Sequence, residues 1–324
     1  MRITVSAWDP SYADSSESMV HANKAQLELG LELVPHDWAP IDPPSTTPAP
    51  PRVLVVDGVR RLDARVDIAV DERSPQAGLC ASYAAGVVVC TLAEKTPAAR
   101  LDTSLIERGL FSQEPGDGMH AGRLAHYVPR RVVATDPADL INAVQDRLTA
   151  LEAKVSMQAD PGESDLLVLD GALRGRAHIP GAVGYIKSHQ RSYLPDELHS
   201  VVGGLSAGQR TPVFGLTTTW KRHSWYLRLP GGGDGAWAGI ARLEASADLT
   251  VSAVTALADA SARVLPRLAS APHKDPRAPQ NLTPIAGLER ALRMKLGDPA
   301  LLLRRLRASS HPGGPTASTS SAML

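Results

Sequence analysis

The sequence predicts an α/β domain built around one mixed sheet. Short apolar runs typical of strands come first in the chain beyond residue 51, and segments with helical spacing of apolar residues come later. The chain is also long enough for a large core, because 324 residues with 43% apolar content bury roughly three quarters of their unfolded surface on folding. One large domain or two small ones are therefore expected.

The first predicted strands follow one another as in a meander. Residues 53–56 are an uninterrupted apolar run, as in a strand buried on both faces, and Asp57-Gly58 is expected to end it. Residues 60–70 alternate between apolar and polar, which indicates a half-buried strand. Residues 79–92 continue as a third strand.

An amphipathic helix is expected to follow Asp136, a residue type that caps helix N-termini, with Pro137 in the first helical position. Apolar residues recur at helical spacing from there to about Ser156, so one face of the helix is apolar. A second short apolar run, residues 166–169, ends at Asp170-Gly171. The remaining predicted elements are strands at residues 182–186, 212–217, 224–229 and 236–243, and helices at residues 250–268 and 284–296.

Composition divides the chain into three parts. Residues 1–51 form an acidic appendage that ends in a proline-rich connector, which cannot pair in a sheet or lie inside a helix. Residues 52–308 are expected to form the main domain, and the low-complexity tail at residues 309–324 is expected to be disordered. Residues 171–229 carry eight Lys or Arg against two acids, so this stretch is suited to attracting phosphate.

Composition also excludes several classes of protein. Lys+Arg and Asp+Glu both number 34, so the formal net charge is zero and disorder of the bulk is excluded. Cys80 and Cys90 are too few for a secreted disulfide framework and have no zinc-ligand spacing. The sequence has neither a signal-peptide core in residues 1–18 nor an apolar run of roughly 18 residues that could cross a bilayer. A soluble protein of the cytoplasm, with no membrane partner, is expected.

A strand-Asp-Gly motif occurs twice, at Asp57-Gly58 and at Asp170-Gly171. Either copy alone is explained by a turn, because Asp-Gly is favoured there. If the two strands are neighbours, however, the two carboxylates lie within a few ångströms, and like charges that close raise a pKa or require a cation. Carboxylate oxygens suit magnesium or manganese, so the pair predicts a metal site that acts on phosphates.

A third acid for such a site is expected on the amphipathic helix. Glu152 is flanked at helical spacing by Leu148 and Val155, so it borders the buried face of the helix, whereas Asp146 faces solvent. Periodicity alone leaves another interpretation open, in which Glu152 pairs with a base on its own helix.

The order of these motifs resembles that of the NurA nucleases. The resemblance covers roughly residues 50–300 and rests on strand-Asp57-Gly58, the paired strands, the helix with Glu152, strand-Asp170-Gly171-Ala172-Leu173 and Gly184-Tyr185-Ile186-Lys187-Ser188. It implies an RNase H-like mixed β-sheet flanked by helices, with an acidic metal site. It also implies cleavage of DNA ends and single strands with Mn²⁺ or Mg²⁺, a homodimer, and a hexameric HerA-type ATPase as partner in DNA end processing.

By position, the resemblance assigns the catalytic site to Asp57, Glu152, Asp170 and Lys187. The three acids would hold two metals for an in-line phosphodiester displacement, and Lys187 would neutralise the non-bridging oxygens. The chain departs from the family pattern near its C-terminus, where residues 281–290 lack the histidine of the family. Glu289 lies nearest to that place and is a fourth candidate metal ligand.

The expected DNA contacts are Arg60, Arg174, Arg191, Lys221 and Arg222. Two of them belong to residues 219–228, where bases alternate with aromatic residues, a composition that suits single-stranded DNA. The same stretch also fits a strand whose Trp225 and Leu227 face the core while Lys221 and Arg228 face water.

Two other functions remain open. The missing histidine also fits a catalytically silent relative that binds DNA or an ATPase as a scaffold. Two Asp-Gly strand ends also grip a metal nucleotide in actin-like ATPases, and saturable ATP binding would indicate that function. Metal-dependent cleavage of DNA distinguishes a nuclease from both.

Overall fold

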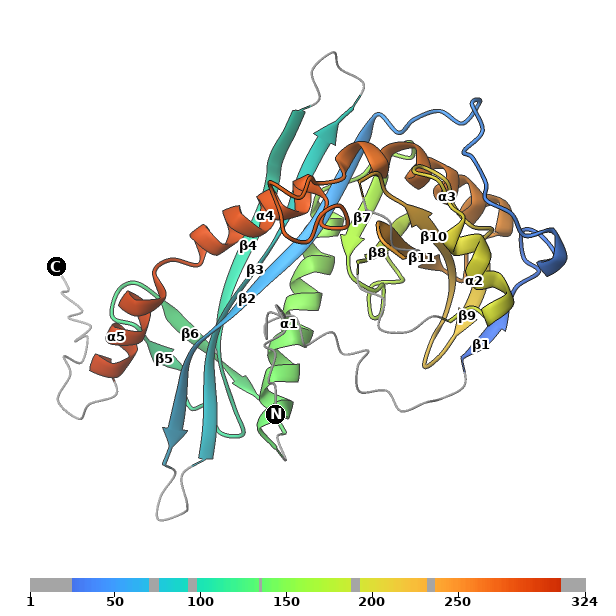
Figure 1. Cartoon of the computed structure of the whole chain (residues 1–324). Coiled ribbons are helices and arrows are strands. Elements are labelled where there is room, and N and C mark those ends of the chain that lie inside the picture. The colour runs from blue at the N-terminus through green and yellow to red at the C-terminus, as the bar shows by residue number, and fades with distance from the viewer. Residues whose placement is uncertain are drawn as a thin grey trace, which may run out of the picture.

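Eleven strands of the described chain form one mixed sheet, and helices cover both of its faces (Figure 1). The structure is a computed structural model, and it describes residues 25–69, 76–92, 98–133, 136–187, 193–231 and 237–309. Across the sheet the strands are ordered β1-β9-β10-β11-β8-β7-β2-β3-β4-β6-β5. The predicted mixed α/β class is therefore confirmed.

The strands are β1 (Gln26–Glu28), β2 (Arg52–Ile68), β3 (Gln76–Thr91), β4 (Ala98–Ser112), β5 (Met119–His120), β6 (His126–Arg131), β7 (Leu166–Asp170), β8 (Ala182–Ile186), β9 (Phe214–Thr217), β10 (Lys221–Arg228) and β11 (Ile240–Ser246). The helices are α1 (Pro137–Gln158), α2 (Asp196–Gly203), α3 (Val251–Val264), α4 (Thr283–Lys295) and α5 (Pro299–Ser309), with 3-10 helices η3 (Pro35–Asp37) and η4 (Leu265–Leu268). Among the described residues, no helix combines the length and the apolar character that a membrane span requires.

β2 runs without a break through Asp57-Gly58, where the sequence predicts the end of a strand. Asp57 pairs with Gly86 of β3 within one antiparallel ladder. The predicted strands at residues 53–56 and 60–70 are therefore one strand of 17 residues. β3 pairs in turn with β4, a strand that no predicted element covers, and the three strands form an antiparallel meander.

Gly58 is required by helix packing and not by a turn. A Cβ atom at this position would lie 2.6 Å from Leu148 Cδ1 and 2.7 Å from Glu152 Oε1, both on α1. Contacts that short force the Leu148 and Glu152 side chains to shift, so glycine allows α1 to approach β2 this closely. The prediction of a turn at Asp57-Gly58 is therefore wrong, because the glycine serves a tertiary contact.

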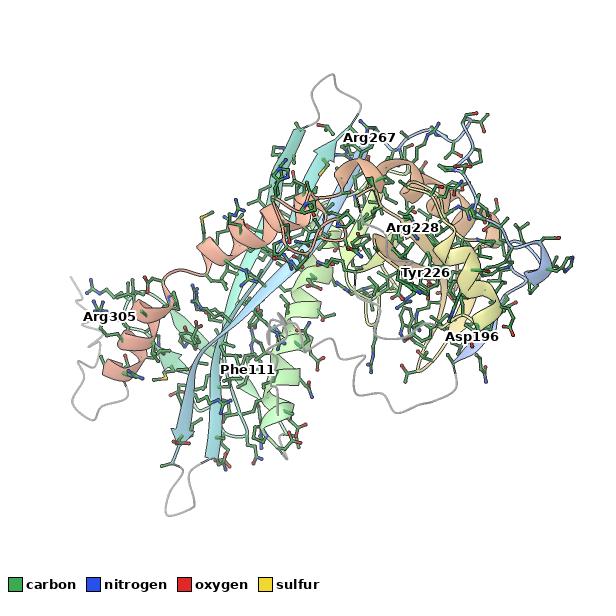
Figure 2. The ribbon with its side chains drawn as sticks, viewed as in Figure 1. Phe111, Asp196, Tyr226, Arg228, Arg267 and Arg305 are labelled. Carbon is green, nitrogen blue, oxygen red and sulfur yellow. The ribbon has the colours of Figure 1, made fainter. Side chains whose placement is uncertain are left out.

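Strand alternation sends successive side chains of β2 to opposite faces of the sheet. Val55 packs with α3 and α4 in one hydrophobic cluster, whereas Val56 packs with α1 in a second cluster. Phe111 of β4 belongs to the second cluster and lies beside α1 (Figure 2). Asp57 therefore points to the α4 face of the sheet, and Gly58 points to the α1 face.

α1 begins and ends close to where the sequence predicts. The Asp136 side chain accepts hydrogen bonds from the backbone N–H groups of Ala138 and Asp139, and the Asp139 side chain accepts one from Asp136 in return. This capping box satisfies N–H groups that have no partner inside the helix. The helix then connects the meander to β7, which pairs with β2 in parallel.

The second half of the sheet extends from β7 through β8, β11, β10 and β9 to β1. The strands predicted at residues 166–169 and 182–186 are confirmed, and those predicted at 212–217, 224–229 and 236–243 are present with shifted bounds. The helix predicted at residues 250–268 corresponds to α3 and η4, and that at 284–296 corresponds to α4. β5, β6, α2 and α5 match no predicted element.

Residues 25–51 pack against this sheet. β1 pairs with β9 at the sheet edge, and the rings of Trp38 and Phe214 lie 6.0 Å apart between centroids. Phe214 and Tyr226 belong to the hydrophobic cluster under α2, as Figure 2 shows for Tyr226. The first 24 residues and the tail from residue 310 lie outside the described residues, so the predicted disorder of the tail stays a prediction.

Candidate metal centre

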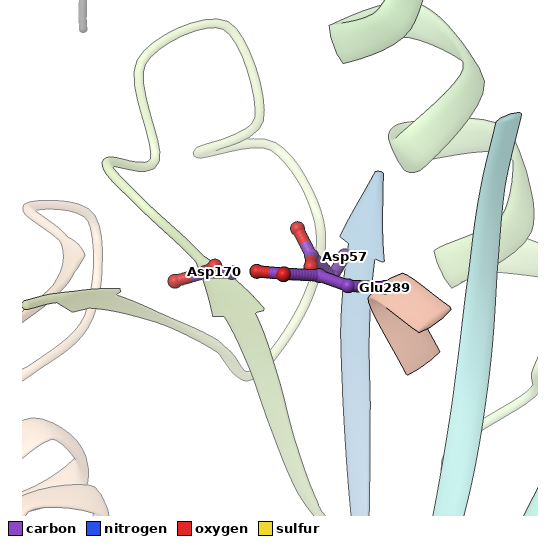
Figure 3. A group of neighbouring side chains, drawn as sticks. All are labelled: Asp57, Asp170 and Glu289. Atoms are coloured by element: carbon purple, nitrogen blue, oxygen red, sulfur yellow. The ribbon is translucent and has the colours of Figure 1, made fainter. Parts of the chain in front are cut away.

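Asp57 and Asp170 lie side by side because their strands are parallel neighbours. Val56 of β2 is in register with Leu169 of β7, so the next residue of each strand is an aspartate. The condition set by the repeated motif, that its two strands be neighbours, is met. Glu289 of α4 joins the two aspartates, and one carboxylate oxygen of each acid lies within 4.8 Å of the others (Figure 3).

Asp57 is the most enclosed of these three acids, with 7% of its surface exposed. Its Oδ1 accepts a hydrogen bond from the Gly58 N–H at 2.7 Å, whereas Oδ2 is buried and has no partner among the described residues. Burial raises the pKa of Asp57 well above its usual range and the charge of Asp170 raises it further, while Lys187 lowers it. An enclosed carboxylate with a free oxygen and acidic neighbours is positioned to accept a cation.

Asp170 ends β7 with one oxygen paired and one free. Its Oδ2 accepts a hydrogen bond from Lys187 Nζ at 2.6 Å, and its Oδ1 is buried without a partner in the described ranges. Burial lowers the pKa of Lys187, but the carboxylates of Asp170 and Asp57 raise it more, so the net shift is upward. Lys187 therefore stays charged, and it belongs to the site instead of standing as a solvated charge at a strand edge.

A chain of polar contacts connects Lys187 to Glu289. Lys187 Nζ donates to Asn281 Oδ1 at 3.0 Å, and Asn281 Nδ2 donates to Asp275 Oδ2 at 2.6 Å. Asp275 Oδ1 accepts from Arg277 Nε at 3.3 Å, and Arg277 donates to both Glu289 oxygens, at 3.2 Å and 3.0 Å. We call Asp275, Arg277 and Asn281 the 275–281 network. It fixes the orientation of two of the three acids from one segment ahead of α4.

The structure does not bring Glu152 into this group. Glu152 lies on the α1 face of β2, where its Oε1 occupies the space beside Gly58 that a Cβ would enter, and its Oε2 accepts a hydrogen bond from Arg176 Nη1 at 2.5 Å. Burial raises the pKa of Glu152, while Arg176 lowers it. The reason is strand alternation: a helix that covers Gly58 delivers its acid to the face opposite Asp57. Glu289 occupies the third position instead.

The sequence left two roles open for Glu152, and the structure shows neither of them. It is neither a ligand of the group formed by Asp57, Asp170 and Glu289 nor paired with a base on its own helix. Its ion pair is made with Arg176, which lies in the segment after β7. Helical periodicity places a residue on a face of its helix, but it contains no information about which loop packs there.

The basic residues expected to contact DNA differ in how far they are exposed. Arg174 is exposed in the segment after β7, and Lys221 is exposed at the start of β10. Arg60 is half-buried on β2. Arg191 lies outside the described residues.

Arg222 lies in the interior of the protein. It is 1% exposed, its Nε lies 3.0 Å from Glu244 Oε2, and its guanidinium carbon lies 4.6 Å from the centroid of the Trp220 ring. Trp225 on the same strand is fully buried. The alternation of residues 219–228 therefore reflects a core strand, and the charge of Arg222 is neutralised internally instead of being presented to DNA.

Sequence reasoning did not find the 275–281 network or Arg176. The polar residues of the segment directly before α4 were a visible signal, because that helix carries the candidate acid Glu289. Their roles depend on contacts with Lys187 at the far end of β8, and sequence spacing does not report such contacts.

The acids of this centre form a hard-donor set. Three carboxylates converge from β2, β7 and α4, and two of their buried oxygens have no donor among the described residues. Oxygen donors of this kind are preferred by Mg²⁺ and Mn²⁺. No protein-family model matches the chain, and no curated protein matches it in sequence.

Proposed function

We propose that this chain is a divalent-metal-dependent nuclease that hydrolyses phosphodiester bonds in DNA. The observation that carries the proposal is the pair of buried oxygens, Asp57 Oδ2 and Asp170 Oδ1, that have no partner among the described residues and lie beside Glu289. Buried acceptors without donors cost free energy, and each one in a folded protein calls for an explanation such as a bound ion.

The donor set fits Mn²⁺ or Mg²⁺, which Asp57, Asp170 and Glu289 would hold. Such a cation supplies an activated water and stabilises the leaving oxygen of a phosphodiester in an in-line displacement. Lys187 and Arg277 fix the orientation of two ligand carboxylates through the contacts described above. Their side chains are 15% and 32% exposed, so their positive charges also lie where they can neutralise the non-bridging oxygens of a phosphate.

The order of strands supports a finer proposal. The run β4-β3-β2-β7-β8 is a five-stranded mixed sheet whose central strand, its parallel neighbour and a late helix carry the three acids. This arrangement fits the RNase H-like, NurA-type architecture that the motif order implies. The same resemblance leads us to propose DNA ends or single strands as substrate, a homodimer, a HerA-type hexameric ATPase as partner, and the cytoplasm as location.

The test is cleavage of single-stranded and blunt-ended DNA by the purified full chain in titrations of Mn²⁺ and Mg²⁺. We expect cleavage that EDTA abolishes and that Asp57→Asn reduces to background. Asp67→Asn is the matched control, because Asp67 lies on the same strand but is exposed and distant in sequence from the acid group. This control variant should cleave at the wild-type rate.

DNA that stays intact across both metal titrations would contradict the proposal. Retained DNA binding without metal-dependent turnover would indicate the catalytically silent scaffold instead. Loss of cleavage in both Asp57→Asn and Asp67→Asn would point to a general effect on the strand and not to the metal centre.

A further inference from the structure

The buried guanidinium of Arg176 is surrounded by oxygen atoms. Its Nη1 donates to Glu152 Oε2 at 2.5 Å, and its Nη2 donates to the backbone carbonyls of Asp170, at 3.2 Å, and of Ala172. Arg176 and Glu152 are 5% and 6% exposed. One carboxylate and two carbonyl oxygens are also the donor types that Mg²⁺ and Mn²⁺ take.

Asp170 connects this guanidinium to the candidate metal centre. The side chain of Asp170 joins Asp57 and Glu289, while its backbone carbonyl accepts the hydrogen bond from Arg176. A cation between Glu152 and the end of β7 would have to displace Arg176, whose buried charge would then lack its carboxylate partner. Removing one member of a buried ion pair is strongly unfavourable.

We propose that the centre holds a single divalent cation and that Arg176 takes the place of a second one. This inference rests on the proposed function and specifies the composition of the same site. Glu152, the acid that the resemblance assigns to a two-metal site, is neutralised by Arg176. Arg176 is thus a positioning residue that supplies a fixed positive charge next to Asp170.

The test counts Mn²⁺ ions bound to the full chain, by electron paramagnetic resonance of free Mn²⁺ during a titration. Wild type should bind one ion per chain. The double variant E152Q/R176M removes both charges together, so it leaves no unpaired buried charge, and it should also bind one ion per chain. Asp57→Asn should bind none, which locates the ion at the acid group.

A second variant tests whether Arg176 takes the place of a second cation. Arg176→Ala opens the space between Glu152 and the two carbonyls, so it should bind a second, weaker Mn²⁺ ion. Mn²⁺ should also raise the Tm of Arg176→Ala more than that of wild type, because the added ion neutralises Glu152. If Arg176→Ala does not fold, the wild-type count and the double variant still decide the question.

Two Mn²⁺ ions per wild-type chain, one of which is lost in E152Q/R176M, would overturn this inference while leaving the proposed function intact. A folded Arg176→Ala variant that binds only one ion would also overturn it. A wild-type chain that binds no Mn²⁺ would overturn the proposed function, and this inference with it.

Discussion

Two buried aspartates of β2 differ in how their oxygens are satisfied. Asp63 accepts hydrogen bonds from Arg61 Nε at 2.7 Å, from Tyr127 Oη at 2.9 Å and from the Ser82 hydroxyl. Asp57 accepts one from the adjacent backbone N–H and keeps Oδ2 without a partner among the described residues. A fully bonded carboxylate stabilises the fold, whereas one with a free buried oxygen and acidic neighbours destabilises it. Stability therefore does not explain the side chain of Asp57, and this supports the cation that we propose for the site.

We expect Asp57→Asn to stabilise the metal-free protein by about 1–3 kcal/mol, because burial and the neighbouring acids disfavour the charged form of Asp57 that the unfolded chain adopts at pH 7. Urea unfolding in EDTA at pH 7 measures the change in the free energy of unfolding. Asp67→Asn, at an exposed position of the same strand, should change it by no more than about 0.5 kcal/mol. A lower stability of Asp57→Asn would contradict this account of the site.

The pH dependence of this effect has a definite sign. The pKa of Asp57 is raised in the folded state by burial and then by Asp170, so between the usual aspartate pKa and the raised value the folded chain binds more protons than the unfolded chain. Stability contributed by Asp57 is lost as pH rises through that window. The advantage of Asp57→Asn should therefore shrink as the pH of the EDTA titration is lowered toward the usual aspartate pKa.

At the scale of elements, two close contacts position the acids. α1 packs on β2 at Gly58, and the segment between η4 and α4 carries the 275–281 network that holds Glu289. The cap of α1 and the apolar periodicity of α1 and α4 are local signals in the sequence, because they involve residues a few positions apart. The strand end predicted at Asp57-Gly58 is wrong because this signal is local too. An Asp-Gly pair fits a turn, but it equally fits a continuous strand that a helix crosses at the glycine.

Gly58→Ala should destabilise the protein by about 1–3 kcal/mol, because the added methyl group would overlap Leu148 and Glu152. Gly287→Ala is a matched control in α4, where no atom lies within 4 Å of the added Cβ. This control should stabilise the protein by about 0.5–1 kcal/mol, since alanine is favoured over glycine inside helices. Equal effects of the two substitutions, measured by urea unfolding, would argue against close packing of α1 on β2.

Asn281→Ala should weaken Mn²⁺ binding by about 10–100-fold, the range typical for groups that orient metal ligands. Asn281 is fully buried and connects Lys187 to Asp275. Its removal therefore loosens Lys187, which orients Asp170, and Asp275, which holds Arg277. Gln280→Ala is the control, because the contact that Gln280 makes with Tyr185 uses its backbone carbonyl. An unchanged Kd for Mn²⁺ in Asn281→Ala would show that the network does not orient the ligands.

At the scale of the whole molecule, one continuous sheet places distant segments together. The N-terminal residues of the described chain join its β9 edge, and Arg210 connects them to α3 through Glu32, at 2.9 Å and 2.8 Å, and Asp259, at 2.7 Å. Arg210 is 1% exposed. This ion triad around a buried guanidinium links residues 25–51 to the body that contains the candidate metal centre.

Arg210→Ala should destabilise the protein by about 3–5 kcal/mol, because it leaves the buried Asp259 and the partly buried Glu32 without their shared cation. Arg100→Ala is the control: Arg100 pairs with Asp102 at 2.8 Å, but its side chain is 68% exposed. A surface pair of this kind contributes about 0–1 kcal/mol. Thermal or urea unfolding of the two variants should separate them clearly, and a small effect of Arg210→Ala would contradict the proposed link.

The sequence by itself determined the α/β class, the cap of α1, the apolar strands β7 and β8, and the two aspartates that follow apolar runs. These features depend on the identity and spacing of residues close together in the chain, which propensity and periodicity report directly. The repeated motif was sufficient to single out Asp57 and Asp170, whereas Lys187 and Glu289 were singled out by the resemblance to the NurA pattern.

Only the tertiary structure decided which of the candidate acids meet. The packing of α1 over Gly58 placed Glu152 on the opposite face from Asp57, and the chain before α4 brought Glu289 and the 275–281 network to the site. Arg222 entered the core and Arg176 entered an oxygen-lined position for the same reason. The face of a sheet that a distant helix or loop covers is set by the packing of the whole chain, because contacts between remote segments have no local sequence signature.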